Sequence, residues 1–187
     1  MVQIVQYTNQ AAILIAINER DGVDQVLLTQ RAAHLTLHGG EVAFPGGKWE
    51  TTDSDLLETA LRESHEEVGL APDRVAVIEK LAASHTRGGI RVTPYVGRIE
   101  SAEGLTANPD ELESLFWVPI DFLLEDLRVR TDIFEFGGVE YWAPVYHFKG
   151  YEIWGFTSRV LIEFLNRTYH LKISREHPAK ELRFRSG

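Results

Sequence analysis

Three glutamates are spaced so that they can bind a metal ion together. Glu63 and Glu67 are four residues apart and Glu66 is three residues after Glu63, so in a helix all three share one face. Like charges on one face destabilise a helix unless a cation offsets them, and carboxylate oxygens suit the hard cations Mg²⁺ and Mn²⁺. The spacing indicates a divalent metal site, with a solvated acidic face as the simpler alternative.

The residues around the three glutamates favour the metal site. The segment 44–47 reads Phe-Pro-Gly-Gly and precedes the helix. Its glycines, Gly46 and Gly47, would let the backbone come close to a ligand. Arg62 directly precedes Glu63 and can brace a neighbouring carboxylate. A glycine loop followed by an arginine and three glutamates is a more specific pattern than an acidic helix alone.

The segment 47–70 resembles the Nudix box, whose pattern is Gly, five residues, Glu, seven residues, then Arg-Glu-hydrophobic-x-Glu-Glu-x-Gly-hydrophobic. Six positions of the second half agree with that pattern: Arg62, Glu63, Glu66, Glu67, Gly69 and Leu70. The first half departs from the pattern. One extra residue separates Gly47 from Arg62, and Ser54 stands in the register of the first glutamate.

The resemblance implies a fold, a reaction and a set of roles. The fold would be the Nudix-type α/β/α sandwich, a mixed α+β structure with a mixed central sheet. The reaction would be hydrolysis of a pyrophosphate bond with Mg²⁺ or Mn²⁺ as cofactor. The metal ligands and catalytic residues would be Glu63, Glu66 and Glu67. Arg62 and Gly69 would support the box, and Asp53 or Asp55 could supply the carboxylate that pairs with Arg62.

The general base of the reaction is less closely defined by this resemblance. In Nudix enzymes it is a glutamate of the box or one from a later loop. Glu111 is the candidate for a later-loop carboxylate that completes the metal site or activates water. A surface charge near a turn is the alternative interpretation of Glu111.

A second group of segments resembles the coenzyme A pyrophosphatase branch of the family. Residues 27–32 (Leu-Leu-Thr-Gln-Arg-Ala), Gly40 and 44–47 are similar to its signature, although Thr36 stands where the signature has arginine. Four later segments also resemble this branch: 92–97, 108–112, 116–119 and 153–157. The resemblance implies cleavage of coenzyme A or its derivatives into 3′,5′-ADP and 4′-phosphopantetheine or acyl-phosphopantetheine. The alternatives are a Nudix pyrophosphatase for ADP-ribose or a dinucleotide, and a non-catalytic nucleotide-binding module.

Basic residues near these motifs are candidates for binding the substrate. Arg31, Lys48 and Arg91 could neutralise phosphates, and arginine can do so through two parallel hydrogen bonds. Each of the three, taken alone, is also an ordinary surface residue. Gly46 and Gly47 are the backbone candidates. The motifs Gly-x-Ser-x-Gly and Gly-Lys-Ser/Thr are absent, so α/β-hydrolase and P-loop functions lack their key residues.

The elements that must position these residues are predicted from the apolar pattern. The helix that carries the glutamates runs from Asp55 to the stop at Gly69, after N-cap candidates at 51–54. Residues 31–41 are predicted to be a loop. Two hairpins are expected, 11–17 with 25–29 and 133–136 with 139–148. The other predicted elements are strands at 42–44, 75–83, 91–99 and 151–154, and helices at 120–127 and 158–166.

The composition fits one globular domain. At 187 residues, 44% hydrophobic and 25% charged, the chain is expected to form a single Nudix domain over 1–187, with a core at about 11–168 and a peripheral or frayed tail at 172–187. The absence of cysteine excludes disulfides and thiolate chemistry and suits a reducing compartment.

The charge and the apolar runs restrict the partners. A net charge of −9 argues against a nucleic-acid partner. The apolar run at 11–17 is too short to cross a membrane and lacks the basic start of a secretory signal. We expect a cytoplasmic monomer or homodimer that acts on a small, coenzyme A-like diphosphate.

Overall fold

The long strand β1 (Gln10–Arg20) organises the larger of two sheets in the computed structural model, which describes residues 7–136 and 138–185. A turn at Asp21-Gly22 connects β1 to β2 (Val23–Arg31), its antiparallel partner, as the sequence predicts. On its other side β1 pairs in parallel with β7 (Arg91–Ile99). The sheet is therefore mixed, with the order β3-β2-β1-β7-β5.

Short strands extend this sheet. They are β3 (Val42–Ala43), β4 (Gly46–Lys48), β5 (Ala76–Lys80), β6 (Ser84–His85) and β8 (Leu112–Pro119). β4 pairs with β1 and β8 pairs with β2. The sequence did not predict β4, because Pro45-Gly46-Gly47 is typical of a strand end. Its pairing with Ala11–Ile13 places the two glycines at the centre of the candidate site.

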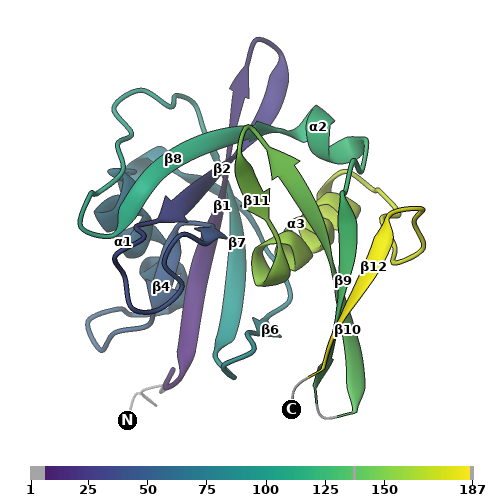
Figure 1. Ribbon diagram of the computed structural model, residues 1–187. Helices are drawn as coiled ribbons and strands as arrows, with labels where there is room; N and C mark the ends of the chain where they lie inside the picture. The colour runs from purple at the N-terminus through teal and green to yellow at the C-terminus, as the bar shows by residue number, and fades with distance from the viewer. Residues whose placement is uncertain (1–6, 137, 186–187) are drawn as a thin grey trace.

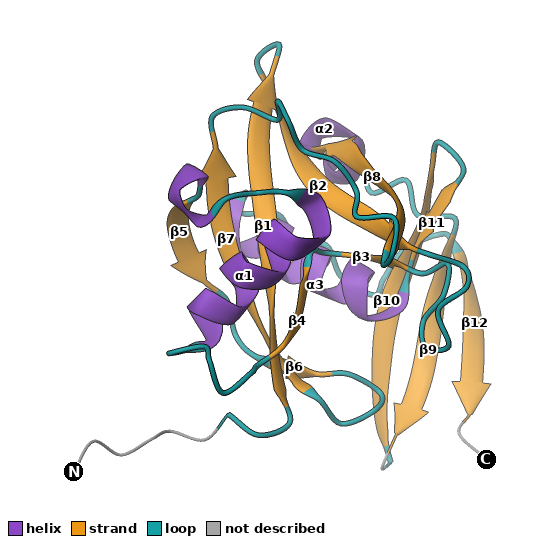
Figure 2. Ribbon diagram, turned by 90° about the vertical axis from the view of Figure 1, so that its left-hand side faces the viewer, coloured by secondary structure: helices purple, strands orange, loops and turns teal. Residues whose placement is uncertain are grey.

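Two helices cover opposite faces of this sheet (Figures 1 and 2). Side chains alternate along β1, so Leu14 and Ala16 pack in the cluster that includes α1 (Leu56–Val68), whereas Ile15 and Ile17 pack with α3 (Gly155–Thr168). Both faces of the sheet are therefore buried. The arrangement is the predicted α/β/α sandwich with a mixed central sheet.

A smaller sheet lies beside α3 and has the order β11-β10-β9-β12 (Figure 1). Its strands are β9 (Arg130–Phe136), β10 (Val139–Phe148), β11 (Tyr151–Ile153) and β12 (Lys180–Arg185). β9 and β10 form the predicted hairpin. Of the two alternatives for the tail, peripheral or frayed, β12 is not frayed: it is an end strand of this sheet, pairs in parallel with β9 and stacks Phe184 on Phe134 at a centroid distance of 5.4 Å.

Other differences from the predicted elements are at their ends. The strand expected at 75–83 is β5, which is shorter; a 3-10 turn (Pro72–Arg74) precedes it, and a bulge after Val77 interrupts its pairing with β7. The helix α2 (Ile120–Leu124) stops short of Leu127, since Asp126 has a φ of 47°. Across 7–136 and 138–185 the helices are all too short or too polar to cross a membrane.

Candidate active site

The helix α1, which carries the three glutamates, is fixed at both ends. Asp55 caps its start, where the carboxylate accepts a hydrogen bond from the Glu58 N–H at 2.9 Å. Glu58 in turn accepts a hydrogen bond from the Ser54 N–H at 2.7 Å, one residue before the N–H that a capping box would use. Gly69 ends the helix with a φ of 71°, a conformation that favours glycine. The cap lies one residue beyond the predicted candidates at 51–54.

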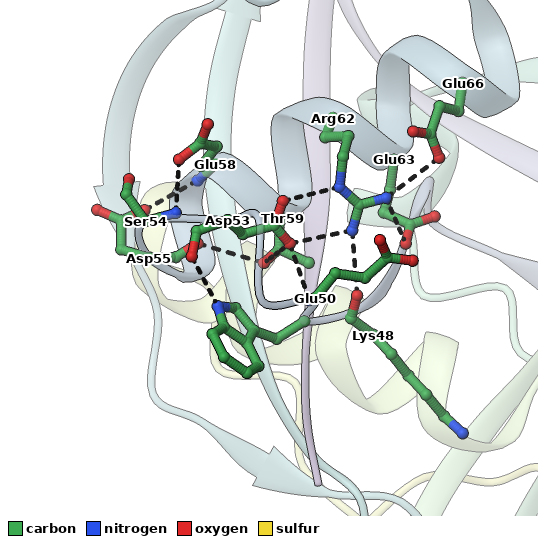
Figure 3. A network of polar contacts seen from close by, with 11 residues as sticks. Lys48, Glu50, Asp53, Ser54, Asp55, Glu58, Thr59, Arg62, Glu63 and Glu66 are labelled. Atoms are coloured by element: carbon green, nitrogen blue, oxygen red, sulfur yellow. Dashed lines mark hydrogen bonds and ion pairs between the residues drawn. The ribbon is translucent and has the colours of Figure 1, made fainter. Parts of the chain in front are cut away.

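Arg62 is anchored on Asp53 (Figure 3). Its Nε and Nη2 donate to the two carboxylate oxygens of Asp53 at 2.8 and 3.0 Å. Burial opposes the charge of Asp53, yet hydrogen bonds from Arg62, the Glu50 N–H and Thr59 outweigh burial and hold its pKa below the usual value. Of the two aspartates that could pair with Arg62, Asp53 does so and Asp55 caps the helix.

The same guanidinium holds two box glutamates. Nη1 of Arg62 lies 3.1 Å from a carboxylate oxygen of Glu63 and 3.1 Å from one of Glu66. Nη2 also donates to the Lys48 carbonyl at 3.2 Å. Arg62 therefore connects the start of the box, the helix and the end of β4 (Figure 3).

Glu67 is the most buried box glutamate, with its side chain 4% exposed. Its Oε2 accepts the Gly46 N–H at 3.0 Å, and Nη1 of Arg31 lies 3.8 Å from its Oε1. Burial raises the pKa of Glu67 to about 8 against the opposing effects of Gly46 and Arg31, and the charges of Glu63 and Glu111 add to the rise. The fold thus places a carboxylate where its charge is poorly compensated.

Glu63 lies directly against Gly47. A Cβ added to Gly47 would stand 2.3 Å from the carboxyl carbon of Glu63, so a side chain at position 47 would displace this carboxylate. Burial raises the pKa of Glu63, and the charges of Glu66 and Glu111 add to this rise. Glu66, in contrast, is 52% exposed.

The loop that carries Glu111 is attached to the end of α1. The Asn108 N–H donates to the Glu67 carbonyl at 2.8 Å, and the Asn108 amide donates to the Glu66 carbonyl at 3.4 Å. The Glu111 carbonyl accepts the Ala32 N–H at 2.9 Å, so this loop also contacts the segment after Arg31. These contacts bring Glu111 close enough to raise the pKa of Glu63 and Glu67. Asn108 was not among the predicted site residues, because its contacts with the carbonyls of α1 join segments that are far apart in the sequence.

The chemistry of these groups fits a hard divalent cation. The donors are carboxylate oxygens, and burial and mutual repulsion disfavour their charge in the absence of a cation. Within the described part of the chain, the carboxylates and imidazoles do not converge in groups of three that could already hold a metal ion. Instead Glu63 and Glu66 bind Arg62, and Glu67 binds Gly46. A bound cation would compete with these partners for Glu63, Glu66 and Glu67.

The three candidate phosphate ligands do not gather in one place. Arg31 lies at Glu67, whereas Arg91 donates to the side chain of Gln10 at 2.9 Å. The side chain of Lys48 points away from Arg62 and the glutamates (Figure 3). Over 7–136 and 138–185, neither Lys48 nor Arg91 has a carboxylate partner within ion-pair distance.

Comparison with protein families matches residues 8–136 to the NUDIX domain. The chain is 36% identical to Nudix hydrolase 15, mitochondrial, of Arabidopsis thaliana over 167 residues, which are 86% of this chain and 59% of that protein. It is 39% identical over 158 residues to the uncharacterized Nudix hydrolase NudL of Yersinia enterocolitica, covering 82% of this chain and 78% of that one. The chain thus spans about three fifths of the Arabidopsis relative.

Solved structures have the same fold. A MutT/nudix family protein from Enterococcus faecalis superposes with a TM-score of 0.55 at 17% identity, covering 86% of this chain and 62% of that one. The Nudix hydrolase RenU from M. smegmatis gives a TM-score of 0.52 at 26% identity, covering 62% of this chain and 73% of that one.

Proposed function

The chain belongs to the Nudix hydrolase family, and on this premise we propose that it hydrolyses a diphosphate linkage with a divalent metal ion, Mg²⁺ or Mn²⁺. The observation that carries the proposal is the approach of Glu63 and Glu67 to two consecutive glycines. Glu63 abuts Gly47 and Glu67 accepts the Gly46 N–H. A pair of buried carboxylates beside a glycine backbone fits a site for a metal-bound phosphate better than it fits a solvated acidic surface.

Glu63, Glu66 and Glu67 would hold the metal ion. When bound, such an ion supplies a positive charge that polarises phosphate oxygens and lowers the pKa of an attacking water. Nudix hydrolases generally use divalent metal ions. The donor set supports this cofactor, since it consists of oxygen ligands and lacks the sulfur ligands of softer metals.

The other residues would orient and neutralise the reacting groups. A glutamate, either Glu111 or one of the box, accepts the proton of the attacking water. Arg31, half-buried beside Glu67, offsets the charge that develops on the phosphoryl oxygens. Arg62 and Asp53 act as positioning residues, because they fix the helix and the side chains of Glu63 and Glu66.

We propose coenzyme A or one of its derivatives as the substrate. The support is the segment from Leu27 to Gly47, which resembles the coenzyme A pyrophosphatase signature and ends at the two glycines of the site. The products would be 3′,5′-ADP and 4′-phosphopantetheine or its acyl form. The test is product analysis by mass spectrometry on coenzyme A, oxidised coenzyme A and acyl-coenzyme A with Mg²⁺ or Mn²⁺. ADP-ribose, a dinucleotide and a nucleoside triphosphate serve as comparison substrates.

A second candidate substrate is another nucleoside diphosphate derivative, such as ADP-ribose or a dinucleotide. It is motivated by Thr36, an exposed threonine where the signature has arginine. Turnover of ADP-ribose equal to or above that of coenzyme A would replace the coenzyme A proposal by this one. Ligand binding without turnover of any diphosphate would instead indicate a non-catalytic module.

A further inference from the structure

A surface hollow lies on the other side of β4 from the glutamates. Its volume is about 270 Å³, and its lining residues are Thr8, Asn9, Gln10, Lys48, Trp49 and Ile90. This is below the range of roughly 300–1,000 Å³ that is usual for drug-sized ligands. The hollow therefore has room for one part of a large substrate and not for the whole molecule.

The strand β4 separates the hollow from the box. Position 47 faces α1, because a Cβ there would collide with Glu63. Successive side chains of a strand point to opposite sides, so Lys48 faces away from the glutamates, as Figure 3 shows. Position 47 thus faces the carboxylates of α1, whereas the next residue, Lys48, places a cation on the opposite side of the strand.

The walls of the hollow are held in place by contacts with the rest of the fold. Trp49 donates its indole N–H to the Asp53 carbonyl at 3.1 Å and its backbone N–H to the Gln10 carbonyl at 3.0 Å. The Asn9 amide donates to the Gly89 carbonyl at 3.1 Å. Arg91 donates to the side-chain oxygen of Gln10 at 2.9 Å. Lys48 is exposed and lines the hollow, so its ammonium group can reach a ligand there.

The charge of the hollow is opposite to that of the protein. The chain has 28 acidic and 19 basic residues, yet the lining contains one cation, three uncharged polar side chains and no carboxylate. Arg91 adds a second cation beside Gln10. An anionic group is the ligand that this composition favours.

We propose that the hollow binds the phosphorylated ribose end of the substrate, with Lys48 pairing with a phosphomonoester that is separate from the diphosphate. This inference rests on the proposed function. A nucleoside diphosphate derivative with a 3′-phosphate, as in coenzyme A, carries two anionic groups on one ribose. The diphosphate would lie at the glutamates on one side of β4, and the phosphomonoester would lie at Lys48 on the other side. Among the described strands β4 pairs only with β1, so a substrate could reach around its other edge. Lys48 is then a specificity-determining residue.

The test compares binding of adenosine 3′,5′-bisphosphate with binding of 5′-AMP by isothermal titration calorimetry in EDTA. The variants are Lys48→Gln, Lys48→Arg and Lys172→Gln, the last of which neutralises an exposed lysine that does not line the hollow. We expect the wild type to bind the bisphosphate about tenfold more tightly than 5′-AMP, in keeping with one charge-assisted hydrogen bond. Lys48→Gln should remove this preference, whereas Lys48→Arg and Lys172→Gln should retain it.

Equal affinities in the wild type, no measurable binding of the bisphosphate, or an unchanged preference in Lys48→Gln would each overturn the inference. The proposed function is tested separately by turnover of coenzyme A with Mg²⁺. Turnover without a bisphosphate preference would leave the function standing and remove the role of Lys48. A preference for the bisphosphate that depends on Lys48, without turnover of any diphosphate, would leave the role of Lys48 standing and remove the proposed function.

Discussion

Arg62 reaches back nine residues along the chain to Asp53 and binds both of its carboxylate oxygens, at 2.8 and 3.0 Å. In the Nudix pattern the position of the first glutamate falls on Ser54. The partner of Arg62 is the residue before it, Asp53. The carboxylate that pairs with Arg62 therefore stands one residue before the position that the pattern gives it. Since Arg62 also holds Glu63 and Glu66, Asp53 orients these proposed metal ligands through Arg62.

The first prediction concerns the stability that Asp53 contributes. Asp53→Asn removes a buried charge partner of Arg62 and should lower the free energy of unfolding by about 2–4 kcal/mol. Asp55→Asn is the matched control, because asparagine caps helices as well as aspartate, and it should change the value by less than about 0.5 kcal/mol. Urea denaturation measures both. Equal losses in the two variants would contradict the role of Asp53.

The second prediction concerns the room that Gly47 leaves for Glu63. Gly47→Ala places a Cβ 2.3 Å from the carboxyl carbon of Glu63 and must displace this side chain. A shift of about 1 Å at a reacting centre can reduce the rate roughly 10²-fold, and we expect a loss of that size in kcat. Gly88→Ala is the control, since its Cβ would meet nothing closer than 3.8 Å. Full activity of Gly47→Ala would show that turnover does not need the close approach of Glu63 to Gly47.

The third prediction separates catalysis from binding. Glu67→Gln keeps the shape of the side chain but removes the charge that would hold the metal ion, so turnover should fall by roughly 10²–10⁴-fold while substrate binding is retained. Glu58→Gln is the control on the same helix, because the amide oxygen of glutamine can still accept the hydrogen bond from the Ser54 N–H. EDTA should abolish turnover of the wild type, and Mg²⁺ or Mn²⁺ should restore it. Activity that survives both Glu67→Gln and EDTA would refute a metal-dependent reaction.

The fourth prediction is a pH dependence of stability far from the site. Hydrogen bonds from Arg98, at 2.8 and 2.9 Å, and from Tyr169, at 2.9 Å, outweigh burial and hold the pKa of Asp24 below its ordinary value of 3.8. Because the folded-state pKa is the lower one, Asp24 contributes stability above the unfolded pKa and loses it as the pH falls through the folded pKa.

The measurement is urea denaturation of wild type and Asp24→Asn between pH 7 and pH 2. At pH 7 the variant should be less stable by about 1 kcal/mol, and the difference should shrink below about pH 4. Asp21→Asn is the control, since Asp21 lies in an exposed turn with its side chain 93% exposed. A difference that stays constant down to pH 2 would contradict the assignment to Asp24.

Local patterns predicted the elements that depend on short-range physics. The spacing of Leu56, Ala60 and Val68 predicted α1, and Gly69 marked its end. The hairpin of β1 and β2 follows from two apolar runs around Asp21-Gly22. These features involve neighbours in sequence, so propensity and periodicity determine them.

Contacts between distant segments could not be read in this way. The parallel pairing of β12 with β9 joins Lys180 to Arg130, and nothing in a six-residue strand specifies a partner so far away. The same holds for the anchoring of Asn108 on the end of α1. The placement of Lys48 away from the glutamates depends on which side of β4 faces α1, and the sequence did not predict that β4 exists.

The contacts of Gly46 and Gly47 with two glutamates of α1 have a consequence for how this motif diverges. With β4 and α1 joined at these points, the connection from Trp49 to Asp55 works as a tether of adjustable length. It tolerates an insertion as long as one carboxylate still reaches Arg62. A search template with fixed gaps would therefore overlook such chains, whereas one that scores the pairs 46–67, 47–63 and 53–62 as spatial neighbours would retain them.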